Sequence, residues 1–133
     1  MFELERIDHV ALLVRDVEAS ARWYEEILGF DRLFRDVWGS YPAVVGKGAT
    51  SLALFPVGSP VPNPPPGRDT LCMHHVAFRV DHANFVAAQE ELRRRGIALE
   101  FQDHQIAHSI YFKDPDGHQL EITTYDLSPP GPA

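Results

Sequence analysis

Two histidines occupy matching places in a repeated pattern of this chain. His9 opens a His-Val-Ala run and is followed twenty residues on by Gly29, and His75 opens the same run and is followed twenty-one residues on by Gly96. Repetition of this kind indicates two copies of one structural unit. Equivalent positions meet when such units pack about a pseudo-twofold axis, and two imidazoles that meet can bind a metal ion. The repeat therefore predicts a metal site.

The residues around these histidines predict the same order of elements in both copies. Apolar spacing predicts an amphipathic helix that begins after Asp16 and ends at Gly29, and a second helix that ends at Gly96. The expected strands are 7–14, 30–38, 41–45 and 51–57 in the first copy and 73–80, 97–101, 109–113 and 119–125 in the second. Each copy is thus a βαβββ module, and the predicted fold class is α+β.

The two modules are separated by a proline-rich stretch. Its composition excludes a helix or a central strand, because proline lacks a backbone donor and fixes the backbone angle φ. We expect a single domain that spans 1–133. It consists of module 1 at 1–58, the linker at 59–70, module 2 at 71–127 and a tail at 128–133.

Composition and charge narrow the classes of partner. The chain has 133 residues, is 44% hydrophobic and carries a net charge of −7, which argues against nucleic acid or an anionic membrane as a partner. Its one cysteine, Cys72, excludes an internal disulfide. Neither a signal peptide nor an apolar run long enough to span a bilayer is visible, so we expect a cytoplasmic protein.

The segment from Tyr111 to Glu121 predicts a hairpin whose register can be worked out. Asp114 and His118 should flank a three-residue loop, because its proline suits a type I turn and Gly117 suits the positive φ of a bulge. Counting back from that pair sets Tyr111 opposite Glu121. A loop of two or four residues would turn Tyr111 to the other face of the sheet.

These features resemble the vicinal oxygen chelate superfamily, which includes glyoxalase I, fosfomycin-resistance enzymes, bleomycin-binding proteins and extradiol dioxygenases. The resemblance spans about residues 5 to 126 and rests on the two modules, the His-Val-Ala openings and the run Asp-Pro-Asp-Gly-His-Gln-Leu-Glu. It implies a curved mixed sheet with a metal-containing cleft. It also implies His9, His75 and Glu121 as metal ligands, whereas Ala53 stands where a four-ligand site would have a carboxylate.

Three ligands leave three positions open on a six-coordinate ion, which is the arrangement used by non-haem Fe(II) oxygenases. The expected cofactor is a divalent metal, Fe(II) first and Mn(II) second. Some extradiol dioxygenases have a histidine seven residues before the hairpin tyrosine, as His104 stands before Tyr111. That resemblance implies that Tyr111 orients substrate and that His104, or else His108, moves protons.

A catechol ring-cleaving dioxygenase is therefore the first expectation for the activity. One alternative is a thiol transferase of the fosfomycin-resistance type, or another non-redox lyase or isomerase. Against the transferase, Ala11 stands where those enzymes typically carry a threonine, and their late arginine has no match in 125–133. A metal-free binding protein of the bleomycin-resistance type is the other alternative. The resemblance also implies a small-molecule substrate and a homodimer, with modules paired within one chain or between two.

Overall fold

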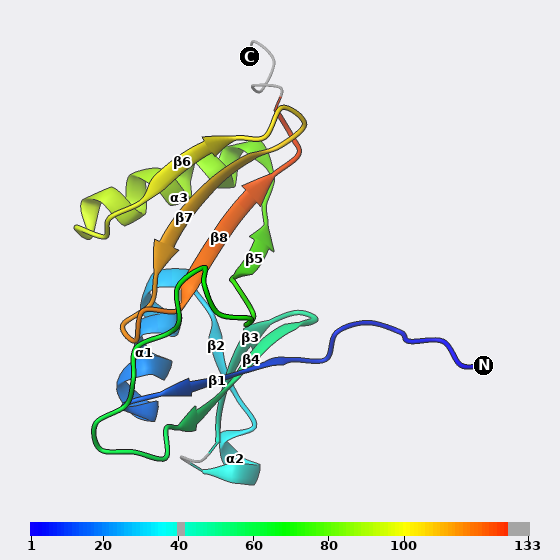
Figure 1. The fold of residues 1–133 in the computed structure, drawn as a ribbon. Coiled ribbons are helices and arrows are strands. Elements are labelled where there is room, and N and C mark those ends of the chain that lie inside the picture. The colour runs from blue at the N-terminus through cyan, green and yellow to red at the C-terminus, as the bar shows by residue number, and fades with distance from the viewer. Residues whose placement is uncertain (40–41, 128–133) are drawn as a thin grey trace. The chain divides into compact units, whose positions relative to one another are not determined.

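The computed structural model describes residues 1–39 and 42–127. The chain divides into two compact units, Met1–Asn63 and Pro64–Ala133. Each unit contains one four-stranded mixed sheet with helices (Figure 1), which confirms the expected α+β class and the two βαβββ modules. No helix in the described ranges is long and apolar enough to cross a membrane.

The two sheets have the same topology. The first unit consists of β1 (Val10–Val14), α1 (Val17–Leu28), β2 (Asp31–Leu33), α2 (Arg35–Trp38), β3 (Ala43–Lys47) and β4 (Thr50–Pro56). The second consists of β5 (Val76–Arg79), α3 (His82–Arg94), β6 (Glu100–Asp103), β7 (His108–Lys113) and β8 (Gln119–Thr124). The strand orders are β1-β4-β3-β2 and β5-β8-β7-β6, so the first strand of each unit pairs in parallel with the last.

Both long helices begin at an aspartate. The Asp16 carboxylate accepts a hydrogen bond from the Ala19 amide at 3.0 Å, and the Asp81 carboxylate accepts one from the Asn84 amide at 2.9 Å. These side chains satisfy amide groups that have no partner inside the helix. The first helix ends where expected, at Gly29 with φ of 68°.

The expected strand over 30–38 is wrong beyond its fourth residue, Leu33. Strand β2 ends at Leu33, and Phe34 takes a left-handed φ of 57° before the short helix α2. The Phe34 and Trp38 rings, one turn apart, contact edge to face at 5.2 Å, which a strand would prevent. Two further expected features, Tyr41 at the start of a strand and the tail at 128–133, lie outside the described residues.

Two strands of the second unit differ from their expected ranges. Strand β5 begins at Val76 rather than at residue 73, so His75 directly precedes it. Strand β6 covers 100–103 rather than 97–101, because its pairing with β7 runs from Glu100 opposite Tyr111 to Asp103 opposite His108.

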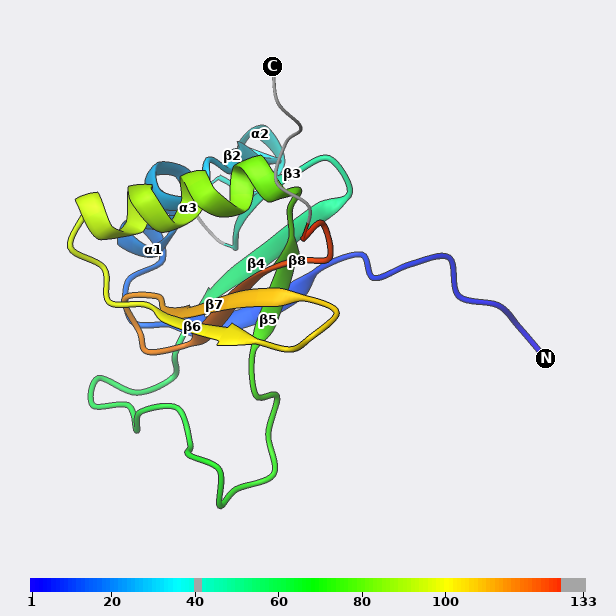
Figure 2. The same ribbon diagram turned by 90° about the horizontal axis from the view of Figure 1, so that it is seen from above.

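The faces of the second sheet have different environments. Helix α3 lies along one face (Figure 2), where Phe85 and Leu92 are buried together with Ile110 and Leu120 of the sheet. Tyr111 and Glu121 are neighbours of those sheet residues in sequence and are paired with each other. Because successive side chains alternate, this pair lies on the face turned away from α3.

Candidate metal centre

The hairpin between β7 and β8 sets the register of the candidate site. The Asp114 carboxylate accepts hydrogen bonds from the amides of Asp116 and His118, both at 2.9 Å, and Gly117 takes a φ of 89°. The Asp114 amide donates to the His118 carbonyl at 3.0 Å and closes the three-residue loop. Tyr111 therefore stands opposite Glu121, as the turn chemistry predicted.

Two expected metal ligands meet in the second unit. His75 Nε2 lies 2.9 Å from Glu121 Oε1, and only 7% of Glu121 is exposed. Ligand atoms bound at about 2.0–2.2 Å on adjacent corners of a coordination sphere are about 3 Å apart. The observed separation and the nitrogen and oxygen donors fit a divalent ion.

A neighbouring side chain occupies the other ring nitrogen of each repeated histidine. His75 Nδ1 lies 2.7 Å from His74 Nδ1, and His9 Nδ1 lies 2.9 Å from Asp8 Oδ2. The hydrogen bond from the His9 ring lowers the pKa of Asp8 below its ordinary value. Metal-binding histidines commonly engage a partner at the nitrogen that does not bind the ion, which fixes the tautomer and orients the ring. Both histidines thus have a partner at Nδ1, so Nε2 is the ring atom that could bind an ion.

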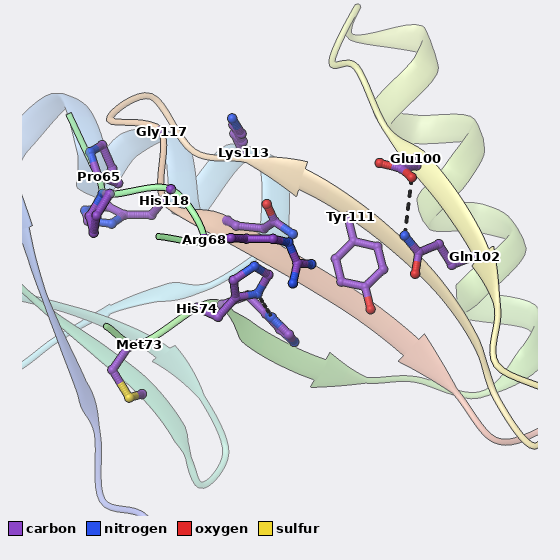
Figure 3. A pocket seen from close by; sticks show the side chains of 14 residues that line it. Pro65, Arg68, Met73, His74, Glu100, Gln102, Tyr111, Lys113, Gly117 and His118 are labelled. Atoms are coloured by element: carbon purple, nitrogen blue, oxygen red, sulfur yellow. Dashed lines mark hydrogen bonds between the residues drawn. The ribbon is translucent and has the colours of Figure 1, made fainter. Parts of the chain in front are cut away.

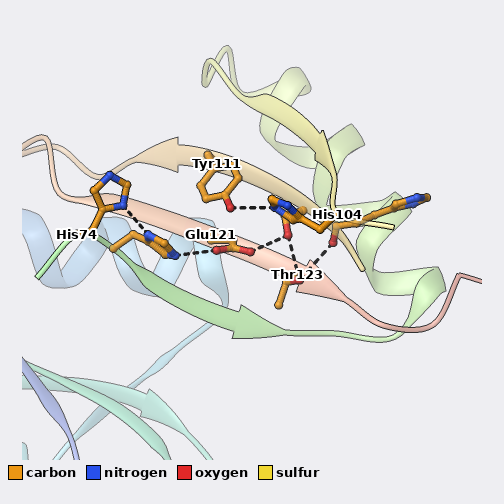
Figure 4. Close-up of polar contacts among 8 residues, drawn as sticks. His74, His104, Tyr111, Glu121 and Thr123 are labelled. Carbon is orange, nitrogen blue, oxygen red and sulfur yellow. Dashed lines mark hydrogen bonds and ion pairs between the residues drawn. The ribbon is translucent and has the colours of Figure 1, made fainter. Parts of the chain in front are cut away.

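A buried serine holds the other carboxylate oxygen of Glu121 (Figure 4). Ser109, which is fully buried, donates its hydroxyl hydrogen to Glu121 Oε2 at 2.6 Å. Its oxygen also lies 3.0 Å from Thr123 Oγ1, which is 3.3 Å from the His108 carbonyl. An ionised carboxylate only accepts, so the serine hydrogen is committed to Glu121 and Thr123 must donate its own. The chain of contacts fixes Oε2 and leaves Oε1 directed toward His75.

Tyr111 forms the other side of this group of residues. Its hydroxyl lies 3.1 Å from His104 Nε2, and its ring meets the His75 ring edge to face at 5.6 Å. Burial, followed by the negative charge of Glu121, raises the pKa of the Tyr111 phenol. The phenol therefore stays protonated at neutral pH and can donate a hydrogen bond to a bound oxygen.

The two histidines suggested for proton transfer lie in different places. His104 contacts the Tyr111 hydroxyl from the turn between β6 and β7. His108 alternates to the α3 side of β7, with its ring 5.3 Å from Phe101 and 6.5 Å from Phe85. The structure therefore brings His104, and not His108, to the tyrosine.

The strand registers also show which residue of the first unit is equivalent to Glu121. Ala53 pairs with Ala11 in the first unit just as Glu121 pairs with Ala77 in the second. In residues 1–39 and 42–127, no three histidine, cysteine or carboxylate side chains form a group able to hold an ion. His75 and Glu121 meet in the second unit, and the third expected ligand, His9, belongs to the first.

A pocket of about 710 Å³ adjoins the two expected ligands within the second unit. His75 and Tyr111 line it together with a segment of the linker (Figure 3). Sequence reasoning missed both this segment and Ser109. Counting back two residues from Tyr111 along the strand would have placed Ser109 on the face of Glu121, but no local pattern marks the linker as part of a pocket.

Known proteins are similar to this chain over most of its length. A family model described as the glyoxalase/bleomycin resistance protein/dioxygenase superfamily matches residues 6–122. The metallothiol transferase FosB of Staphylococcus epidermidis is 30% identical over 128 residues, which cover 94% of this chain and 85% of that protein. The glutathione transferase FosA of Serratia marcescens is 30% identical over 125 residues, which cover 94% and 84%. The crystal structure of a glyoxalase/dioxygenase from Nostoc punctiforme matches with a TM-score of 0.75 and 29% identity, over 93% of this chain and 92% of that one.

Proposed function

The chain belongs to the glyoxalase/bleomycin resistance protein/dioxygenase superfamily, and we propose that it is a metal-dependent transferase that joins a thiol to a small substrate with two adjacent oxygens. Two relatives at 30% identity are a metallothiol transferase and a glutathione transferase. They favour the thiol-transferase alternative over the ring-cleaving dioxygenase that was the first expectation. The observation that carries the proposal is the 2.9 Å approach of His75 Nε2 to Glu121 Oε1.

The proposed ligand set is His9, His75 and Glu121 around one divalent ion, with Mn(II) or Fe(II) as candidates. Bound there, such an ion supplies a Lewis acid for the oxygens of the substrate. Glu121 reaches it through Oε1, because Ser109 holds Oε2. The two histidines present Nε2, because Asp8 and His74 occupy Nδ1.

Tyr111 and His104 are the proposed groups for proton transfer. In thiol transfer the thiol gives up its proton, a sulfur–carbon bond forms, a carbon–oxygen bond at the same carbon breaks, and the released oxygen takes up a proton. The raised pKa keeps the Tyr111 phenol protonated, and His104 at 3.1 Å can return the proton after transfer. A positioned acid of this kind contributes about 10²-fold or more to turnover.

Ring cleavage by O₂ is the second candidate. It is favoured by one specific observation, the contact between His104 Nε2 and the Tyr111 hydroxyl, because this is the pairing that the resemblance to extradiol dioxygenases implied. The same two residues would then orient a catecholate and move its protons.

Metal analysis followed by two assays separates these candidates. The chain is purified without added metal, its metal content is measured, and samples loaded anaerobically with Mn(II) or Fe(II) are tested. Thiol transfer predicts metal-dependent loss of glutathione or cysteine thiol with small epoxides and other electrophiles that carry adjacent oxygens. Yellow ring-opened product from catechols, with no thiol consumed, would establish the second candidate. Failure to bind either metal would leave the metal-free binding protein.

We also propose that the protein is a homodimer, with His9 supplied by the same chain or by the second copy. Light scattering should give twice the chain mass of 15.0 kDa, and a mass of one chain would exclude the dimer. Mixing His9→Ala with Glu121→Gln chains then tells the two arrangements apart. Ligands shared between copies should restore about a quarter of the sites after random exchange, and ligands from one chain should restore none.

A further inference from the structure

The turn between β6 and β7 carries His104, the residue proposed to exchange a proton with Tyr111. Two backbone hydrogen bonds close this turn. The His104 amide donates to the Ala107 carbonyl at 2.8 Å, and the Ile106 amide donates to the His104 carbonyl at 2.9 Å. Gln105, between His104 and Ile106, has a left-handed φ of 70°. A residue with a Cβ adopts this angle at a steric cost, so further stabilisation is needed to keep the turn in one conformation.

The side chain of Asp103 supplies a further bond to this turn. Its Oδ1 accepts a hydrogen bond at 2.8 Å from the amide of Gln105, the residue with the unfavourable φ. Aspartate commonly bonds in this way to the backbone two residues on and thereby fixes the course of a turn. A charged acceptor makes such a bond stronger than a neutral one.

Asp103 holds the turn from the face of the sheet that lies opposite Tyr111. It is paired with His108 across the two strands, and both side chains project from the face that Phe101 shares. His108 Nε2 lies 3.6 Å from Asp103 Oδ1, and its ring lies 5.3 Å from that of Phe101. At 3.6 Å a charged imidazole attracts the carboxylate without a hydrogen bond. His108 thus borders the carboxylate that holds the turn, whereas His104 reaches the Tyr111 hydroxyl at 3.1 Å (Figure 4).

We propose that Asp103 is a positioning residue for proton transfer. Through the Gln105 amide its carboxylate keeps the turn in the conformation that brings His104 to Tyr111. This inference rests on the proposed function, because it assigns a new residue to the same proton-transfer pair. The role is indirect, since Asp103 projects from the face of β6 turned away from the pocket that Tyr111 lines.

NMR of the histidine side chains in the full-length chain tests this role. The protein is labelled with ¹⁵N at histidine and treated with a chelator, and the His104 Nε2 signal is assigned by its loss in His104→Gln. Tyr111→Phe gives the shift of this nitrogen without its hydroxyl partner. Asp103→Ala should move the signal at least half of the way toward that value. Asp103→Asn keeps a side-chain oxygen as acceptor for the Gln105 amide, so it should retain most of the wild-type shift.

Asp126→Ala is the matched control. Asp126 also accepts a hydrogen bond from a backbone amide of the second unit, that of His82 at 3.2 Å, and its loss should leave the His104 signal in place. An Asp103→Ala signal at the wild-type position, or one displaced equally in Asp126→Ala, would overturn the proposal. Because neither metal nor substrate is present, that result would leave the metal-dependent function untouched. Failure of that function would show instead in metal content and thiol consumption.

Kinetics of the metal-loaded chain give a second readout. In the thiol-consumption assay Asp103→Ala should lower kcat by up to about 10²-fold, the whole contribution of a positioned proton-transfer group. KM should stay unchanged, because Asp103 projects away from the pocket, and Asp103→Asn should restore most of kcat. A raised KM with unchanged kcat in Asp103→Ala would contradict a role in positioning the proton-transfer pair.

Discussion

The two units build the same sheet and place different side chains at matching positions. One row of paired residues crosses the middle of each sheet. It reads Leu33, Val44 and Ala53 in the first unit and Glu100, Tyr111 and Glu121 in the second. The first row is apolar, with Val44 and Ala53 buried, whereas the second carries two carboxylates and a phenol. A shared backbone therefore provides a scaffold in one copy and a polar site in the other.

The two units do share a histidine at one matching position. His9 stands at the same place before β1 as His75 does before β5, and each has a partner at Nδ1 from the preceding residue. The repeat therefore keeps one proposed histidine ligand in each unit, whereas the proposed carboxylate ligand, Glu121, has no counterpart at Ala53.

Removal of the Glu121 carboxylate from the second row should have the largest effect, a loss of metal affinity. Glu121→Gln keeps the shape and the acceptor for Ser109 but removes the charge, so metal affinity should fall more than about 100-fold, beyond the loss from an outer-shell change. Isothermal titration with Mn(II) measures it. Glu90→Gln, on the exposed side of α3, is the matched control. Equal affinity of the two variants would refute Glu121 as a ligand.

Addition of a carboxylate to the first row should have the next largest effect, a loss of stability. Ala53→Glu would bury a charge at a position that is 5% exposed, between Ala11 and Val44. In metal-free protein the free energy of unfolding should fall by on the order of 3 kcal/mol, as for other unpaired buried charges. Urea denaturation tests this, with Ala53→Gln as the uncharged control. If the charged variant were no less stable than its control, the apolar character of the first row would not contribute to stability.

Loss of the serine behind Glu121 should have a smaller effect. Ser109→Ala leaves Oε2 without its donor at 2.6 Å, so metal affinity should fall about 10–100-fold. The first unit offers a matched control in Ser20, which is also buried and whose hydroxyl has no hydrogen-bond partner among residues 1–39 and 42–127. Ser20→Ala should bind metal like wild type. The same loss in both variants would point to general destabilisation rather than to positioning of Glu121.

The smallest expected effect concerns ionisation of Tyr111. Burial and Glu121 raise its pKa, so the folded chain keeps the phenolic proton where the unfolded chain loses it. The resulting contribution to stability is full below the ordinary tyrosine pKa, about 10, and is lost as pH rises above it. The difference in tyrosinate absorbance between wild type and Tyr111→Phe should appear at higher pH than for a tyrosine in an unstructured peptide. A midpoint at or below the peptide value would contradict the arrangement.

Much of the second row could be predicted from sequence because it depends on local chemistry. Pro115 and Gly117 define the hairpin loop, and the loop sets Tyr111 opposite Glu121. The repeat likewise predicted that Ala53 is equivalent to Glu121, and the strand registers agree. Turn residues and strand alternation act over a few positions, so a single sequence is enough to predict their consequences.

Contacts that depend on less regular backbone could not be derived from the residue pattern, and for Tyr111 the resemblance left His104 and His108 as alternative partners. His104 reaches Tyr111 from a tight turn in which its amide donates to the Ala107 carbonyl and Gln105 takes a φ of 70°. Phe34 likewise ends β2 at a φ of 57°. Non-glycine residues adopt such angles only where the surroundings favour them, and these surroundings come from tertiary packing.

Anomalous diffraction from crystals grown with Mn(II) tests the central claim most directly. One peak per chain is predicted, about 2.0–2.2 Å from His75 Nε2, Glu121 Oε1 and a His9 Nε2, with no protein ligand from the position of Ala53. A peak bound elsewhere, or no peak in metal-replete crystals, would contradict the assignment of the chemistry to the second unit with one histidine from the first.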